Sequence, residues 1–171
     1  MKIAITGKPR SGKTTLIKAI SHILKSQGIN PVGFYTEEIR RAGRRYGFDI
    51  VKLNGERLPL ARVGSHSPFK VGKYAVFVDN IEKTLKDLIG QVDRESTIII
   101  DEIGKMELLY PPFAEFVESI WQSTDSIIVT IPITDIHPIV RKIRNTVDIN
   151  INLDSQKVDL QTLVDKLISP R

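Results

Sequence analysis

Two hydrophobic periods alternate along this chain of 171 residues. Short runs rich in isoleucine and valine are typical of strands that are buried on both faces. Between these runs, apolar residues recur every three or four positions, as they do on one face of a helix. The alternation predicts an α/β fold with a doubly wound, mostly parallel sheet. The predicted strands lie at residues 3–5, 32–36, 98–100, 125–133 and 147–151, and the predicted helices begin near Lys13, Asn80, Pro111, His137 and Val158.

The block between residues 32 and 78 interrupts this alternation. A strand is expected to resume at 46–53 after a hairpin turn, and a third short strand is expected within 71–78. The segment 56–72 contains two prolines and two glycines and is predicted to be irregular. We interpret the block of about 32–78 as an antiparallel β insertion in a single domain that spans residues 1–171.

Composition narrows the chemistry and the location. The chain has no cysteine, which excludes disulfides and thiolate metal sites. The predicted first strand leaves no room for a signal peptide, and no apolar run approaches the ~18–20 residues of a membrane span. We therefore expect a cytoplasmic protein without a membrane partner. Zinc ligands are not expected, because no pair among His22, His66 and His137 has the required spacing.

Residues 7–14 fit the spacing G-x-x-x-x-G-K-[ST] of a phosphate-binding loop. A predicted strand precedes them and a predicted helix follows, which is the setting that this motif needs. The pattern predicts that the sheet is of the phosphate-loop NTPase type. The residues of the motif are Gly7, Lys8, Pro9, Arg10, Ser11, Gly12, Lys13 and Thr14.

The residue types in this loop each have a chemical reason. Gly7 and Gly12 allow the backbone to turn its N–H groups inward around phosphate oxygens. The helix that follows adds the positive end of its dipole. Lys13 brings a full charge to the β- and γ-phosphates, and Thr14 offers a hydroxyl ligand to Mg²⁺. Arg10 lies at the loop tip, either as a phosphate contact or as a solvated side chain.

Two carboxylates follow the predicted strand 98–100. Ligands of open α/β sheets bind at the carboxyl ends of strands, so we expect Asp101 to meet the loop and to bind Mg²⁺. Successive strand side chains point oppositely, and we expect Glu102 to reach an in-line water and act as the catalytic base. Glu107 is the alternative base. Lys105 either offsets triphosphate charge or is solvated.

The formal net charge is +5, and the densest group of cations is Arg-Arg-Ala-Gly-Arg-Arg at 40–45. A basic balance can indicate nucleic acid, but a site for Mg²⁺ and triphosphate also needs cations, so we expect nucleotide instead. The arginine cluster is either a solvated hairpin tip or a lid that contacts a triphosphate or a partner. A cation at the γ-phosphate accelerates phosphoryl transfer, and the sequence does not choose among the candidates Arg10, Arg44, Arg45, Arg141 and Arg144.

Further motifs accompany the loop in a fixed order. They are Val-Gly-Phe-Tyr-Thr-Glu-Glu-Ile-Arg at 32–40, Gly-Arg-Arg-Tyr-Gly-Phe-Asp at 43–49, Arg-Val-Gly at 62–64, Val-Gly-Lys-Tyr at 71–74 and Asp-Glu-Ile-Gly-Lys-Met-Glu at 101–107. With them, about residues 1–150 resemble the small nucleoside-triphosphatases first described from thermophiles, whose human relative is called cancer-related nucleoside-triphosphatase. The motifs within the insertion are not general to phosphate-loop proteins, which makes the resemblance specific.

The resemblance implies a Mg²⁺-dependent enzyme that hydrolyses ATP, GTP, CTP, UTP and TTP to the diphosphate and phosphate. The family has two nucleotide-binding segments, which correspond here to residues 7–14 and 98–105. Within the second segment, only Asp101 and the residues after it can touch a ligand. The isoleucines before Asp101 form the strand that brings these residues to the site. Lys13 and Glu102 are the expected catalytic residues. The second segment comprises Ile98, Ile99, Ile100, Asp101, Glu102, Ile103, Gly104 and Lys105.

Some features remain outside this picture. Residues 152–157 read Asn-Leu-Asp-Ser-Gln-Lys where human-type members carry an Asn-Arg pair, so we assign this corner no contact with base or phosphate. Residues 145–148 read Asn-Thr-Val-Asp and lack the lysine of the guanine-specific N-K-x-D box, which predicts a broad base preference. A partner-dependent ATPase or switch and a nucleotide or nucleoside kinase remain alternatives. Nothing demands more than a monomer.

Overall fold

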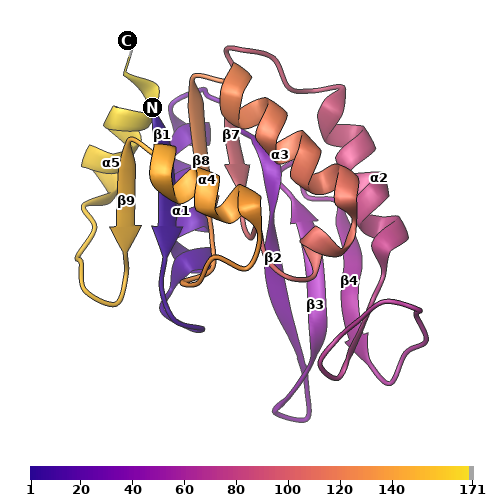
Figure 1. The fold of residues 1–171 in the computed structure, drawn as a ribbon. Coiled ribbons are helices and arrows are strands. Elements are labelled where there is room, and N and C mark those ends of the chain that lie inside the picture. The colour runs from indigo at the N-terminus through magenta and orange to yellow at the C-terminus, as the bar shows by residue number, and fades with distance from the viewer. Residues whose placement is uncertain (170–171) are drawn as a thin grey trace.

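The computed structural model describes residues 1–169, whose strands form one nine-stranded sheet in the order β5-β6-β4-β3-β2-β7-β8-β1-β9 (Figure 1). Strands β2, β7, β8, β1 and β9 run parallel, and β2, β3, β4, β6 and β5 are joined antiparallel. The strands are β1 (Lys2–Thr6), β2 (Val32–Arg41), β3 (Arg44–Lys52), β4 (Arg57–Val63), β5 (Lys70–Val71), β6 (Tyr74–Val76), β7 (Thr97–Ile100), β8 (Ser126–Thr130) and β9 (Ile149–Asn152).

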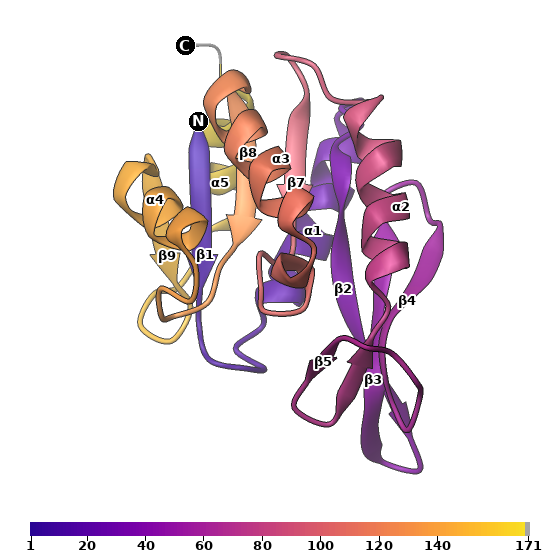
Figure 2. The same cartoon turned by 45° about the vertical axis from the view of Figure 1, so that its right-hand side comes forward.

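Helices cover both faces of the parallel half of the sheet. Helices α1 and α5 lie on one face, and α2, α3 and α4 lie on the other (Figures 1 and 2). Successive side chains of β7 point to opposite faces of the sheet. Ile98 and Ile100 pack against α2–α4, whereas Ile99 packs against α1 and α5. The predicted doubly wound α/β fold is confirmed. The helices are α1 (Lys13–Ser26), α2 (Val78–Ile89), α3 (Pro111–Ser123), α4 (Pro138–Thr146) and α5 (Leu160–Ile168), with a 3-10 turn η1 at Glu107–Leu109.

The antiparallel half is continuous with the parallel half through β2. The first residues of β2 pair with β7, and the strand then runs on into a hairpin with β3. The insertion expected at about 32–78 is therefore an extension of the same sheet, and residue 32 is not a boundary. Figure 2 shows the β2–β3 hairpin projecting beyond the carboxyl ends of the parallel strands.

Two strands lie in a segment that was predicted to be irregular. The segment 56–72 contains β4, which pairs with β3 and β6, and the two-residue β5, which pairs with β6. Strand β4 contains Pro59, which has no N–H to donate to a neighbouring strand. The proline is accommodated because the register between β3 and β4 shifts there, between Phe48 and Asp49 of β3. Leu60 and Ala61 are buried in the core, and this burial stabilises the strand despite its proline.

Two helix starts lie close to their predicted positions. Helix α2 begins at Val78, two residues before the predicted start at Asn80, and has no side-chain cap. Helix α4 begins at Pro138 and is capped by His137, whose Nδ1 accepts a hydrogen bond from the Ile139 N–H at 3.2 Å. Within residues 1–169, no helix combines the length and apolar character needed to cross a membrane.

Candidate active site

The phosphate-binding loop connects β1 to α1 at the carboxyl edge of the sheet. Gly12 precedes the helix with φ 97°, in the left-handed region that glycine adopts without strain. The Ser11 N–H donates to the Lys8 carbonyl at 3.0 Å, and the Leu16 N–H donates to the Gly12 carbonyl at 2.9 Å. These bonds close the loop and leave the first N–H groups of α1 facing the space that it surrounds.

The loop encloses a tight cradle. A Cβ added to Gly7 would lie 2.3 Å from Ser11 Oγ, so only glycine fits there. Ser11 Oγ is buried and has no hydrogen-bond partner within residues 1–169. The Lys13 ammonium donates to the carbonyls of Gly7 and Lys8, at 2.8 and 3.2 Å. A buried unsatisfied oxygen and a lysine folded over the loop are features of a cradle built for a polar ligand.

Asp101 follows β7 and lies against the loop, as predicted. Its Oδ2 accepts a hydrogen bond from Thr14 Oγ1 at 2.7 Å, and its Oδ1 accepts one from Thr130 Oγ1 at 2.5 Å. The side chain is 1% exposed. Burial raises the pKa of Asp101, and the hydrogen bonds from Thr130 and Thr14 oppose that rise. The carboxylate is therefore fixed in place by hydroxyls from α1 and β8.

The Thr14 hydroxyl and the Asp101 carboxylate fit a magnesium ion. Both are hard oxygen donors, and their 2.7 Å contact shows that they converge on one point. Among residues 1–169, no group of three or more histidine, cysteine or acidic side chains could hold a metal by itself.

Glu102 shares a cavity with Asp101. Strand β7 ends at Ile100, so the alternation of strand side chains does not extend to this pair, and both carboxylates face the loop. Burial and the neighbouring Asp101 charge raise the pKa of Glu102. Its carboxylate has no hydrogen-bond partner within residues 1–169, which leaves it available to a water molecule.

Glu107 lies behind this pair. Its carboxylate is 4% exposed and accepts a hydrogen bond from the Gly104 N–H at 3.2 Å. Burial, reinforced by the Glu102 charge, raises the pKa of Glu107 to about 8. Glu107 does not line the cavity of the phosphate loop, and it contributes instead to a neighbouring cavity of about 310 Å³, which Glu102 and Lys105 also line.

The main cavity has a volume of about 700 Å³ and combines three parts of the chain. The loop and the start of α1 form one wall, the ends of β7 and β8 form the floor, and the insertion forms the opposite wall. The insertion therefore lies on the loop side of the molecule. The lining residues are Gly7, Pro9, Arg10, Gly12, Lys13, Thr14, Thr15, Thr36, Glu37, Glu38, Arg45, Phe48, Asp101, Glu102, Pro132 and Ile133.

The structure separates the five candidate arginines. Only Arg10 and Arg45 line the cavity. Arg141 and Arg144 instead pair with Asp135, at 3.4 and 2.9 Å. The fifth candidate, Arg44, lies in an adjoining groove.

The second predicted segment is divided in the same way. Asp101 and Glu102 reach the cavity, whereas the isoleucines are fully buried in the core and do not line it. Gly104 is buried, and Lys105 is exposed at the neighbouring cavity. The buried residues are Ile98, Ile99, Ile100 and Ile103.

Sequence reasoning missed several contributors. Thr130 ends β8, and a threonine at the end of the strand beside β7 was the one signal that could have identified it. Glu37 and Phe48 come from the insertion, and the motifs at 32–40 and 43–49 contain them without indicating that they line the cavity. Residues 152–157 were assigned no contact with base or phosphate, and the sequence did not show that the Lys8 N–H donates to Asp154 Oδ2 at 3.0 Å, so that this corner supports the outer side of the loop.

Comparison with known proteins identifies the family of this chain. A family model described as NTPase matches residues 2–164. The chain is 43% identical over 170 residues to nucleoside-triphosphatase THEP1 of Thermotoga sp. (strain RQ2), covering 99% of this chain and 94% of that protein. It is 41% identical over 162 residues to human cancer-related nucleoside-triphosphatase, with coverage of 87% and 85%. The crystal structure of THEP1 from the hyperthermophile Aquifex aeolicus superposes with a TM-score of 0.81 at 36% identity, covering 98% of this chain and 99% of that one. The chain belongs to the NTPase family.

Proposed function

We propose that this protein hydrolyses nucleoside triphosphates to the diphosphate and phosphate, with Mg²⁺ and by attack of water on the γ-phosphate. The observation that carries the proposal is the contact of Thr14 with Asp101 at the mouth of the phosphate loop, with Glu102 on the same cavity. This arrangement brings a triphosphate cradle, a pair of metal ligands and a carboxylate base to one edge of the sheet.

Binding of the triphosphate follows from the loop. Inward N–H groups and the positive end of α1 attract phosphate oxygens. The Lys13 ammonium would exchange its two carbonyl contacts for the β- and γ-phosphates, where its charge is better compensated. Thr14 and Asp101 would hold Mg²⁺, which when bound neutralises charge on the phosphate oxygens.

Glu102 is the group proposed to activate water. It accepts the proton as the water oxygen bonds to the γ-phosphorus and the bond to the β–γ bridging oxygen breaks, releasing the diphosphate. A raised pKa suits a general base near neutral pH. Glu107, with a pKa of about 8, holds its proton at neutral pH and adds no third negative charge beside this pair.

Arg10 and Arg45 are the cations proposed to meet the γ-phosphate. Arg10 is carried by the loop itself, and Arg45 is carried by β3 and oriented by Glu38 at 3.2 Å. A cation at this point stabilises charge that develops in the transition state. The insertion thereby completes the site that the loop begins.

A broad base preference is proposed from the cavity walls. Phe48 and the half-exposed Ile133 offer apolar surface to a base, and no asparagine or glutamine lines the cavity formed within residues 1–169. Neither Asn145 nor Asp148, the ends of the incomplete N-K-x-D box, reaches it. Apolar contact is tolerant of base identity, whereas hydrogen-bonding groups select one base.

The test is phosphate release by the protein alone with ATP, GTP, CTP, UTP and TTP, each with Mg²⁺ and with a chelator. Hydrolysis of all five that stops with the chelator is the expected result. Release of phosphate only when a partner protein is added would instead indicate a switch. Transfer of the γ-phosphate to an added nucleoside, with little free phosphate, would indicate a kinase.

A further inference from the structure

A second groove, of about 660 Å³, adjoins the triphosphate cavity. It lies between the tip of the phosphate loop, the β2–β3 hairpin and the turn that joins β5 to β6. Arg10 and Arg45 line both the groove and the cavity, so the two spaces are continuous at the point proposed for the γ-phosphate. The lining residues of the groove are Arg10, Arg40, Arg44, Arg45, Gly72, Lys73 and Tyr74.

This groove carries an excess of positive charge that the protein itself does not balance. Arg40 and Arg45 share one carboxylate, that of Glu38, at 2.7 and 3.2 Å. Arg10, Arg44 and Lys73 form no ion pair within residues 1–169. The lining residues therefore contribute five cations and no carboxylate, with Glu38 alone beside them.

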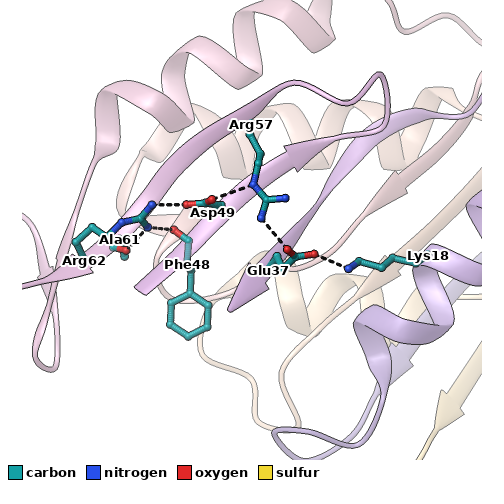
Figure 3. A network of polar contacts seen from close by, with 7 residues as sticks. All are labelled: Lys18, Glu37, Phe48, Asp49, Arg57, Ala61 and Arg62. Atoms are coloured by element: carbon teal, nitrogen blue, oxygen red, sulfur yellow. Dashed lines mark hydrogen bonds and ion pairs between the residues drawn. The ribbon is translucent and has the colours of Figure 1, made fainter. Parts of the chain in front are cut away.

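Elsewhere in the insertion, Lys52, Arg57 and Arg62 each pair with a carboxylate. Figure 3 shows a chain of ion pairs in which Glu37 binds Lys18 at 2.5 Å and Arg57 at 2.7 Å, and Asp49 binds Arg57 at 3.0 Å and Arg62 at 2.5 Å. Most cations near these strands thus have a carboxylate partner. The unbalanced cations are concentrated at the groove, which points to an anionic ligand there.

The backbone also holds like charges together at the hairpin tip. Arg40 faces Arg45 and Arg41 faces Arg44 across β2 and β3, and like charges in such pairs are destabilising. Arg41 is drawn away by stacking on Tyr46, with its guanidinium carbon 3.9 Å from the ring centroid. The turn at Gly72 places Lys73 at the same groove. An anion bound between these groups would relieve the repulsion.

We propose that the groove binds a phosphate chain that continues beyond the γ-phosphate, so that the protein takes nucleoside polyphosphates of four or more phosphates as ligands. The inference rests on the proposed triphosphate site, which anchors the chain. Single-stranded nucleic acid fits less well, because it needs aromatic platforms for its bases. Tyr74 is buried and Tyr46 is covered by Arg41.

The experiment compares the dissociation constants of ATP and adenosine 5′-tetraphosphate with Mg²⁺ at low ionic strength. If Arg40, Arg44 and Lys73 each improve affinity about twofold, the tetraphosphate should bind about eightfold more tightly than ATP. The variant R44Q/K73Q removes two exposed charges that have no ion-pair partner, and it should cut this ratio to about twofold. The control K86Q/R94Q removes the same charges from exposed sites away from the groove and should keep the full ratio.

Each outcome decides the inference. A ratio near one in the natural protein, or a ratio that R44Q/K73Q leaves unchanged, overturns it. Failure to bind ATP at all would instead refute the proposed triphosphate site. If inorganic tetraphosphate binds the natural protein and binds R44Q/K73Q more weakly, the result supports the phosphate site in the groove and shows that the phosphate chain alone is recognised. If an oligodeoxynucleotide loses affinity in R44Q/K73Q while the tetraphosphate gains nothing over ATP, the groove is a nucleic-acid surface and the inference is wrong.

Discussion

The hydroxyl of Thr130 fixes the carboxylate on which the proposed metal site depends. Its Oγ1 donates to Asp101 Oδ1 at 2.5 Å, and the two residues are 0% and 1% exposed. Thr130→Val keeps nearly the same side-chain volume and removes only this donor. Oδ1 then loses its side-chain partner in a residue that is 1% exposed. The perturbation therefore tests one hydrogen bond without opening a cavity.

The magnitude follows from the burial of both groups. A hydrogen bond to a charged group contributes about 1.5–3 kcal/mol, and we expect Thr130→Val to lower the free energy of unfolding by about 2 kcal/mol. Native proteins are stable by about 5–15 kcal/mol, so the variant should stay folded. Loss of a group that orients a metal ligand typically costs about 10–100-fold in metal affinity, which predicts an equal rise in the Mg²⁺ concentration for half-maximal hydrolysis.

Two measurements check this prediction. Urea unfolding followed by the fluorescence of Trp121, the single tryptophan and a buried one, reports stability. A Mg²⁺ titration of phosphate release reports the metal site. The matched control is Thr124→Val, because Thr124 is 1% exposed and its Oγ1 has no hydrogen-bond partner among residues 1–169. Removing an unpaired hydroxyl should leave stability unchanged or raise it by about 1 kcal/mol.

Three results would refute the reasoning. If Thr130→Val unfolds like the natural protein, the hydroxyl does not hold the carboxylate. If stability falls but the Mg²⁺ requirement does not change, Asp101 is held by Thr130 but is not the metal ligand. Equal destabilisation by Thr124→Val would show that the loss reflects threonine replacement in general.

Other residues of the site carry further predictions. Lys13→Ala should abolish triphosphate turnover, and near-normal phosphate release would refute the loop assignment. Glu102→Gln should keep binding of Mg–ATP but reduce turnover at least ~10²-fold, and a loss of that size in Glu107→Gln instead would reassign the base. The pKa of Glu107 is about 8 when folded, above its ordinary 4.5, so the unfolded chain releases this proton first as pH rises. As pH rises from 4.5 to about 8, the contribution of Glu107 to the free energy of unfolding should therefore fall by about 1.4 kcal/mol per pH unit. Urea unfolding at several pH values across this range should show that Glu107→Gln removes this pH dependence of stability. The control Glu115→Gln, on the exposed face of α3, should retain it. The same pH dependence in all three proteins would contradict the raised pKa of Glu107.

Much of the fold follows from local pattern. The run Ile98-Ile99-Ile100 predicts a doubly buried strand because both faces of a parallel sheet are covered, and the structure places helices on both. Strand β4 could not be predicted in the same way, because Pro59 is a local signal against it. Its place depends on a register shift in β3 and on burial of Leu60, which no local window contains.

The sequence by itself determined the loop at 7–14, the carboxylates that follow β7 and the edge of the sheet where they meet. The physical reason is that loop chemistry is local, and that the carboxyl ends of parallel strands share one edge. Only the tertiary structure decided that Thr130 holds Asp101 and that Arg45, not Arg141 or Arg144, faces the site. Those choices depend on strand order and hairpin register, which bring together residues far apart in the chain through packing that no single segment encodes.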